Sequence, residues 1–207
     1  MRRSPPLLTC AAAAIAGLAL VLTSCAPATT GSGPAVAVLN GPAAGRIAGS
    51  AELLQQDMAQ HGALHFHFVN DAAMRFAEGH NDFHHDRAVT SAGRVARSYG
   101  APYAVLIGAP TLERQVSLSA DKSVRTVDVT VRIEAVVVDA ATNQPVSRLS
   151  SQTFEQTRHE SADVALPPVP QDPTVVTLRD QAVGNIAPAV LGALWSALGI
   201  HPSRQPG

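Results

Sequence analysis

The stretch Val127-Asp-Val-Thr-Val-Arg-Ile-Glu-Ala-Val-Val137 alternates apolar and polar side chains along its first nine residues. The polar positions between the apolar ones are Asp128, Thr130, Arg132 and Glu134. A period of two is typical of a β-strand with one buried and one solvated face. The sequence therefore predicts a sheet of which at least one part is covered on one side only.

The segments on either side of this strand complete an antiparallel unit. Ala101–Gly108 predicts a buried strand that runs on through Leu112, Val116 and Leu118, and a turn at residues 120–123 follows it. On the other side, residues 139–144 predict a hairpin loop, after which Val146–Glu155 pairs back as one strand. Strands that are joined by hairpins must be antiparallel.

Strands and helices alternate before this unit. Residues 35–39 and 64–68 predict two strands. Ser50 is expected to cap a helix that ends at Gly62, and Arg87–Tyr99 repeats apolar side chains at helical spacing. Strands that are joined by helices favour parallel pairing.

A final helix follows the Pro-rich segment Leu166–Pro170. Apolar side chains recur along it from Val183 to Leu198, and Pro188 lies inside this stripe, which predicts a kink. The predicted element order is β-α-β-α-β-β-β-α. We therefore expect an α/β fold with a mixed (α+β) sheet on which the helices pack. Residues 35–200 are expected to form a single domain.

The N-terminus has the pattern of an export signal. Arg2 and Arg3 precede an apolar run from Leu7 to Leu22, which is too short and wrongly flanked for a stable transmembrane helix. Two of the chain's 15 basic side chains, Arg2 and Arg3, lie in this signal. Removal of the signal therefore leaves 13 basic and 16 acidic side chains. Such a weakly acidic domain, with a single lysine, offers no footprint for nucleic acid.

The end of the apolar run resembles the lipobox of bacterial lipoproteins. Its residues are Leu22, Thr23, Ser24 and Cys25. The resemblance implies that residues 1–24 are cut off as a signal peptide and that the thiol of Cys25 is acylated. The alternative is an ordinary secreted protein that is cut after position 26 or 28. Because Cys10 would leave with the signal, the folded part would contain no free thiol, disulfide or thiolate metal site.

Acylation would make the membrane a partner of this chain. Each buried methylene of an acyl chain contributes about 0.8 kcal/mol, so two or more chains form a stable anchor. Residues 25–34 then predict a flexible tether, and residues 201–207 a disordered tail. Ala26 after the cysteine, rather than an aspartate, favours the outer over the inner membrane. We expect a periplasm-facing envelope lipoprotein.

The order of the elements resembles a known periplasmic domain. The strings that carry the resemblance are Val36-Ala-Val-Leu39, Tyr99-Gly-Ala-Pro-Tyr-Ala-Val-Leu-Ile-Gly108 and Val136-Val-Val-Asp-Ala-Ala-Thr-Asn143. They are similar to segments of the domain shared by LpoB, CsgG and the amino-terminal region of TolB. The resemblance covers residues 35 to about 198.

This resemblance implies a non-catalytic, protein-binding module. LpoB-like proteins bind and activate a bifunctional peptidoglycan synthase, so an envelope protein of that kind, or an envelope-assembly complex, is the expected partner. CsgG-like proteins form oligomeric export pores, and an oligomeric secretion-accessory collar is therefore an alternative. The chain is too short to add the membrane-spanning hairpins of a pore. The partner-binding residues and the oligomeric state stay open.

A histidine-rich segment suggests a second hypothesis. His80, His84 and His85 lie with Asp82 and Asp86 in seven residues. If this segment is helical, its first two imidazoles lie one turn apart and can share a zinc or copper ion. The chain would then be a metal-binding lipoprotein. The alternative is a solvated loop before a helix, with Asp86 near the helix start.

Other patterns give no support for catalysis. His65 and His67 fall on one strand face, a further ligand-like spacing, but neither histidine pattern contains His-Glu-x-x-His. Glycines 41, 45 and 49 do not have the spacing of a nucleotide-binding loop, and no serine lies in a Gly-x-Ser-x-Gly elbow. We therefore expect no enzyme, and no cofactor apart from the zinc or copper ion considered above.

Overall fold

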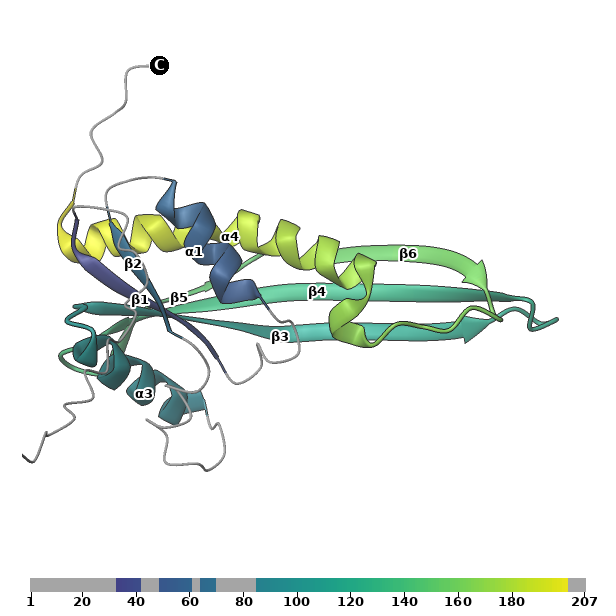
Figure 1. Cartoon of the computed structure of the whole chain (residues 1–207), viewed down its shortest axis with the longest axis horizontal. Coiled ribbons are helices and arrows are strands. Elements are labelled where there is room, and N and C mark those ends of the chain that lie inside the picture. The colour runs from purple at the N-terminus through teal and green to yellow at the C-terminus, as the bar shows by residue number, and fades with distance from the viewer. Residues whose placement is uncertain (1–32, 42–48, 61–63, 70–84, 201–207) are drawn as a thin grey trace, which may run out of the picture.

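The computed structural model describes residues 33–41, 49–60, 64–69 and 85–200, and of residues 85–87 it describes the backbone only. Figure 1 shows the whole chain. The elements in chain order are β1 Ala35–Asn40, α1 Ser50–Ala59, β2 His65–Val69, α3 His85–Ser98, β3 Tyr103–Leu118, β4 Val124–Asp139, β5 Gln144–Ser150, β6 Phe154–Ser161, the 3-10 turn η2 Val169–Gln171 and α4 Pro173–Leu198.

The strands form one mixed sheet, which confirms the predicted fold class. The order of neighbours is β2-β1-β3-β4-β5, and β6 also pairs with β4. β1 runs parallel to β2 and to β3, whereas β3, β5 and β6 are antiparallel to β4. The parallel pairs are those in the part of the chain where strands and helices alternate, as expected from the connections.

The two long strands β3 and β4 divide the sheet into two parts. β1 pairs only with Tyr103–Ile107 of β3, and β5 pairs only with residues 134–139 of β4. Beyond them a narrower sheet continues, in which β6 lines up with residues 124–131 of β4. We call this part, which consists of residues 111–118, 124–131 and 154–161, the strand extension. It projects from the body of the molecule (Figure 1).

Helices cover the two parts of the sheet differently. α1 and α4 lie over one face, and α3 lies over the other face of the central part only (Figure 1). In β4 the side chains of Val127, Val129, Val131 and Ile133 are buried, with half-buried polar residues between them, whereas Val136–Val138 are all buried. The change occurs where α3 adds a second cover. This confirms that part of the sheet has one solvated face.

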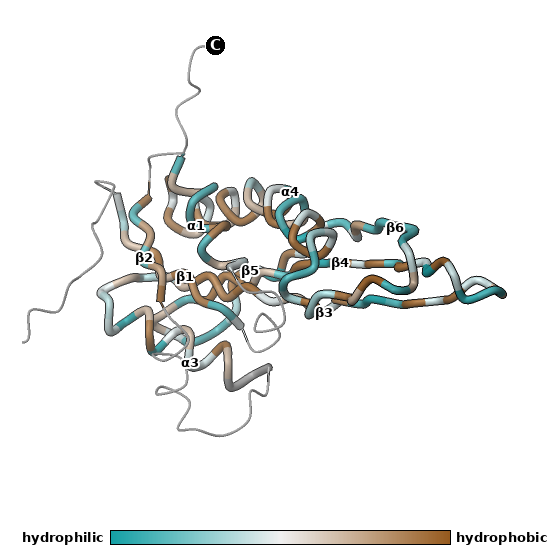
Figure 2. Tube along the Cα trace, turned by 45° about the vertical axis from the view of Figure 1, so that its right-hand side comes forward, coloured by the Kyte–Doolittle hydropathy of each residue, from teal (hydrophilic) through white to brown (hydrophobic). Residues whose placement is uncertain are grey.

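Among the described residues two apolar clusters form the core, one on each face of the sheet. The larger one joins the sheet to α1 and α4, and the smaller one joins it to α3. Hydrophobic residues are frequent along β1 and α4 in Figure 2, which colours the chain by hydropathy. Fully buried side chains of the larger cluster include Val38, Leu54, Met58, Ile107, Ile133, Ile186, Leu191 and Leu194. The burial of each of these side chains stabilises the fold by about 1.5–3 kcal/mol.

α4 is longer than its apolar stripe alone predicts. It begins at Pro173, ten residues before Val183, and ends before Gly199, whose φ of 65° is the left-handed conformation typical of a helix end. By length and composition it could cross a membrane, but its apolar stripe is buried against the sheet. Pro188 lies on its exposed side, and the kink there stays a prediction.

The single strand predicted at Val146–Glu155 is wrong, because two strands occupy this region. β5 ends at Ser150 and β6 begins at Phe154. Between them Ser151 bonds twice to Ile133: its N–H donates to the carbonyl (2.8 Å), and its hydroxyl accepts from the N–H (3.0 Å). Pairing with the central part of β4 thereby ends at β5. It resumes at β6, which pairs with β4 in the extension. The order of helices and strands in the described ranges is β-α-β-α-β-β-β-β-α.

Two helix starts also differ from the prediction. Gly49, with a φ of 86°, precedes the first turn of α1 and provides no side-chain cap, so Ser50 is the first helical residue rather than the cap. α3 begins at His85, two residues before Arg87. The predicted end of α1 at Gly62 lies outside the described residues.

Candidate functional site in the strand extension

Most site residues predicted from the sequence lie outside the described ranges. These are Leu22, Thr23, Ser24, Cys25, His80, Asp82 and His84. The other two, His85 and Asp86, form the start of α3, and their side chains are not described. Among the described residues no group of three histidine, cysteine, aspartate or glutamate side chains is placed to hold a metal ion. Lipidation and metal binding at these residues stay predictions.

The two faces of the strand extension differ in chemistry. The outer face carries polar side chains that bond across strands, such as Thr157 to Asp128 (2.6 Å) and Thr126 to His159 (3.0 Å). The inner face, toward α4, carries buried valines of β4. Arginines interrupt this apolar face, one from each strand of the extension: Arg114 from β3, Arg125 from β4 and Arg158 from β6.

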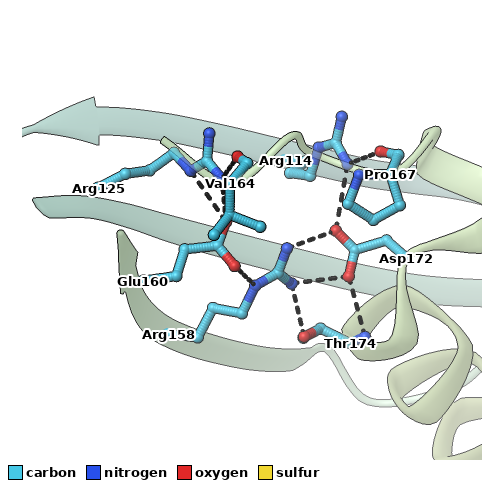
Figure 3. Close-up of polar contacts among 8 residues, drawn as sticks. All are labelled: Arg114, Arg125, Arg158, Glu160, Val164, Pro167, Asp172 and Thr174. Carbon is cyan, nitrogen blue, oxygen red and sulfur yellow. Dashed lines mark hydrogen bonds and ion pairs between the residues drawn. The ribbon is translucent and has the colours of Figure 1, made fainter. Parts of the chain in front are cut away.

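The three arginines meet two carboxylates in an arginine–aspartate cluster (Figure 3). The register places Arg125 beside Glu160 and Val127 beside Arg158, so the side chains converge on one face. The members are Arg114, Arg125, Arg158, Glu160 and Asp172. Asp172, the residue before α4, therefore ties this helix to the extension.

Asp172 is the centre of the cluster and has no exposed surface. Its Oδ1 lies 2.7 Å from Nη1 of Arg158, and its Oδ2 lies 2.8 Å from Nη2 of Arg158 and 3.1 Å from Nη1 of Arg114. Oδ1 also accepts the N–H of Thr174 (3.0 Å), which caps α4. Bidentate arginine–carboxylate pairs of this kind are the strong ones.

These contacts set the protonation state of Asp172. Burial alone would raise the pKa of its carboxyl group, but the hydrogen bonds from Arg158, Arg114 and the Thr174 N–H outweigh burial and lower it. In turn, the hydrogen bond with Asp172 raises the pKa of Arg158. The pair is therefore fully ionised near neutral pH.

The cluster also holds the connector between β6 and α4, residues 162–172. Arg114 donates to the carbonyl of Pro167 (2.7 Å), and Arg125 donates to the carbonyl of Val164 and to Glu160. The connector is thereby fixed over the inner face of the extension (Figure 3). The charged groups therefore bond to one another and to the backbone, and they join the connector to all three strands of the extension.

The far end of the extension is a well-bonded turn. Asp121 accepts hydrogen bonds from the hydroxyls of Ser119 (2.5 Å) and Ser123 (2.6 Å) and from the Ser123 N–H (3.1 Å). The hydrogen bonds from Ser119 and Ser123 lower the pKa of Asp121 to about 2. The turn therefore presents a fixed negative charge at neutral pH.

The extension has two edges that no strand in the described part of the chain pairs with, one on β3 and one on β6. β1 pairs with β3 only as far as Ile107, so residues 111–118 have β4 on one side and no strand on the other. We call these residues the β3 edge. Val116 and Leu118 on this edge are 46% and 55% exposed. An unpaired edge with exposed apolar side chains is a template for pairing with another chain.

The sequence did not reveal this site, although part of it has a local signal. Asp172-Pro173 combines a preferred N-cap residue with proline at the first helical position. That pair could have located the start of α4 and its buried aspartate. The convergence of three arginines could not be read in this way, because it depends on the register of three strands.

The two histidines on β2 do share a face, as predicted. The ring centroids of His65 and His67 lie 4.6 Å apart, with the ring planes at 77°. The ring of Tyr99, just after α3, lies 5.8 Å from that of His67. Burial and the neighbouring His65 lower the pKa of His67.

Comparisons with known proteins concern the fold alone. No protein-family model matches the chain, and no curated protein matches it. The chain aligns with the PelC dodecamer from Paraburkholderia phytofirmans at 13% identity and a TM-score of 0.36, covering 77% of this chain and 90% of that one. It aligns with lipoprotein GNA1162 from Neisseria meningitidis at 14% identity and a TM-score of 0.35, covering 81% and 95%.

A third solved structure is the hypothetical protein CT253 from Chlamydia trachomatis. It aligns at 10% identity and a TM-score of 0.41, covering 80% of this chain and 99% of that one. Identities and TM-scores this low carry no function from one protein to another. The specific resemblance to LpoB and CsgG stays a prediction.

Proposed function

We propose that this chain is a membrane-anchored, non-catalytic lipoprotein of the bacterial envelope that binds another envelope protein through its strand extension. The lipobox at residues 22–25 supports the anchor. The observation that carries the binding role is the β3 edge, which is unpaired in the described part of the chain and bears exposed Val116 and Leu118.

The position of the extension suits this role. β1, which follows the predicted tether, begins beside Tyr103 at the start of β3, whereas the extension lies at the other end of β3 (Figure 1). An anchor at Cys25 would therefore hold the start of the domain near the bilayer and leave the extension pointing away from it. A partner in the periplasm would meet the extension first.

The β3 edge fits a partner that adds a strand. In this mode the main chain supplies the hydrogen bonds, and alternate side chains supply specificity. Leu112, Val116 and Leu118 lie on one face of the edge, while Glu113 and Gln115 lie on the other. The fitting partner is an extended segment with apolar side chains at alternate positions. A peptidoglycan synthase or an envelope-assembly protein is the kind of partner that the family resemblance suggests.

Substitution of Val116 tests the binding role. Val116→Glu places a charge on the β3 edge and is expected to reduce the amount of crosslinked partner at least tenfold in intact cells. Val146→Glu on β5 is the matched control, because Val146 is also a strand valine and is 49% exposed. Surface substitutions of this kind change stability by about 0.5 kcal/mol or less, so both variants should fold. Equal crosslinking by the two variants would contradict the proposal.

The anchor is tested separately at Cys25. Intact-mass measurement of the exported protein is expected to show a start at residue 25 and the mass of attached acyl chains. Cys25→Ala should remove this added mass. A wild-type product without lipid, or one that starts beyond residue 25, would contradict the anchor but leave the β3 edge untouched.

An oligomeric collar is the second candidate function. In the described residues the extension has two unpaired edges, one on β3 and one on β6. Pairing of the β3 edge of one copy with β6 of the next would be a head-to-tail contact, which closes into a ring when the rotation allows. Light scattering distinguishes the two candidates, because a ring-sized species that Val116→Glu dissociates would favour the collar.

A further inference from the structure

The edge strand β2 carries two imidazoles on one face. His65 and His67 are two residues apart, which places both side chains on the same side of the sheet. Their register partners on β1 are Ala35 and Ala37, so the neighbouring strand contributes only methyl groups beside the rings. The two ring centroids lie 4.6 Å apart.

His65 has an unsatisfied ring nitrogen. Its side chain belongs to a residue that is only 7% exposed, and Nδ1 is buried without a hydrogen-bond partner among the described residues. A buried polar atom without a partner destabilises a fold by about 1–3 kcal/mol, so such atoms are rare and call for an explanation. A metal ion that binds the lone pair of this nitrogen would give it a partner.

We propose that His65 and His67 together bind one Cu²⁺ ion. Imidazole nitrogen is a preferred ligand of copper, and Cu²⁺ binds a given set of nitrogen ligands more tightly than the other divalent ions of the first row. His67 is the more accessible of the two residues and provides the entry path. The ring of Tyr99, 5.8 Å from that of His67, borders the site on the side of α3.

The composition of the site determines what kind of binding it supports. Within the described residues no third histidine and no carboxylate joins the pair, so water would fill the other coordination positions. A site with two protein ligands exchanges its ion readily, which suits reversible capture of copper rather than a permanent structural metal. The site lies on the central sheet, apart from the strand extension, and does not depend on the function proposed for the extension.

Titration of the full chain with copper tests the site. We use the chain purified in detergent and CuCl₂ in a buffer that does not chelate metals. We expect the chain to bind one Cu²⁺ ion at this site. His67→Asn is expected to weaken the binding of that ion at least tenfold. The electron paramagnetic resonance spectrum of this copper should show two coupled ring nitrogens in the wild type and one in the variant. Zn²⁺ should bind the same site at least tenfold more weakly.

A matched variant separates this site from the other histidine-rich segment. His84→Asn/His85→Asn removes a second pair of imidazoles and should leave the His67-dependent copper unchanged. Circular dichroism reports whether each variant folds. If His65→Asn fails to fold, His67→Asn and the spectrum decide the result. The proposal is overturned if His67→Asn binds copper like the wild type, or if the bound copper disappears in the His84→Asn/His85→Asn chain.

Discussion

Asp172→Ala is expected to lower the free energy of unfolding by about 3–5 kcal/mol, because it leaves two arginines without their buried partner. The carboxylate is fully buried and bonds to Arg158 at two points and to Arg114 at one. The substitution also removes the cap of α4 at the Thr174 N–H. Urea denaturation followed by circular dichroism measures the change.

Two further variants separate the causes of this loss. Asp180→Ala removes an aspartate that also pairs with an arginine, Arg179 at 2.6 Å, but whose side chain is 47% exposed. Exposed pairs contribute about 0–1 kcal/mol, so this control should change little. Asp172→Asn keeps the shape of the side chain and an oxygen that can cap α4. Its loss in the free energy of unfolding should lie between those of Asp172→Ala and Asp180→Ala. If Asp172→Ala lowered stability no more than Asp180→Ala does, the cluster would not be what holds α4 to the extension.

Acid should weaken this link in a defined direction. The folded-state pKa of Asp172 lies below its ordinary value of 3.8. The stability from the carboxylate is therefore fully present above that ordinary value and is lost as the pH falls through the lower, folded-state pKa. The stability difference between the wild type and Asp172→Asn should accordingly be constant near neutral pH and shrink below about pH 4.

Ile133→Ala is expected to lower the free energy of unfolding by about 2–5 kcal/mol, because it leaves a cavity in the core beneath α4. Ile133 is fully buried in the larger apolar cluster. Its backbone bonds to Ser151 do not involve the side chain, so the junction between β5 and β6 should persist. Urea denaturation of the purified chain measures the loss.

Smaller changes at matched positions calibrate this prediction. Ile133→Val removes a single methylene and should cost about 0.5–1.5 kcal/mol. Val146→Ala, at a side chain that is 49% exposed, should change stability by about 0.5 kcal/mol or less. A loss at Ile133→Ala no larger than that at Val146→Ala would mean that the sheet closes around the vacated space.

The architecture was largely predictable because its causes are local. The alternation along Val127–Ala135 sets which face of this part of β4 is buried, and the connections set which strands are parallel. The division between β5 and β6 was not predictable in this way. Residues 151–153 contain no glycine or proline, and the break arises from where each strand meets β4.

The candidate site was less predictable than the fold. The predicted lipobox is a contiguous motif that the sequence alone suggests, whereas the β3 edge is defined by the absence of a neighbouring strand among the described residues. The sequence of residues 111–118 does not indicate that β1 ends at Asn40 and that, within the described ranges, no other strand pairs with them on that side. Likewise Arg114 lies 58 residues before Asp172 in the sequence, and the two meet only because the strands and the connector fold together.

The length of β3 sets how far the end of the strand extension lies from the start of the domain. Sixteen residues at about 3.3 Å each carry the chain roughly 50 Å from Tyr103 to Leu118. The predicted tether of ten residues would add at most about 35 Å if it were fully stretched. If the protein is anchored at Cys25, the end of the extension could contact partners up to about 85 Å from the lipid. The strands β3 and β4 would span most of that distance. Shortening β3 and β4 together by equal numbers of residues would shrink the volume it can search without altering the anchor.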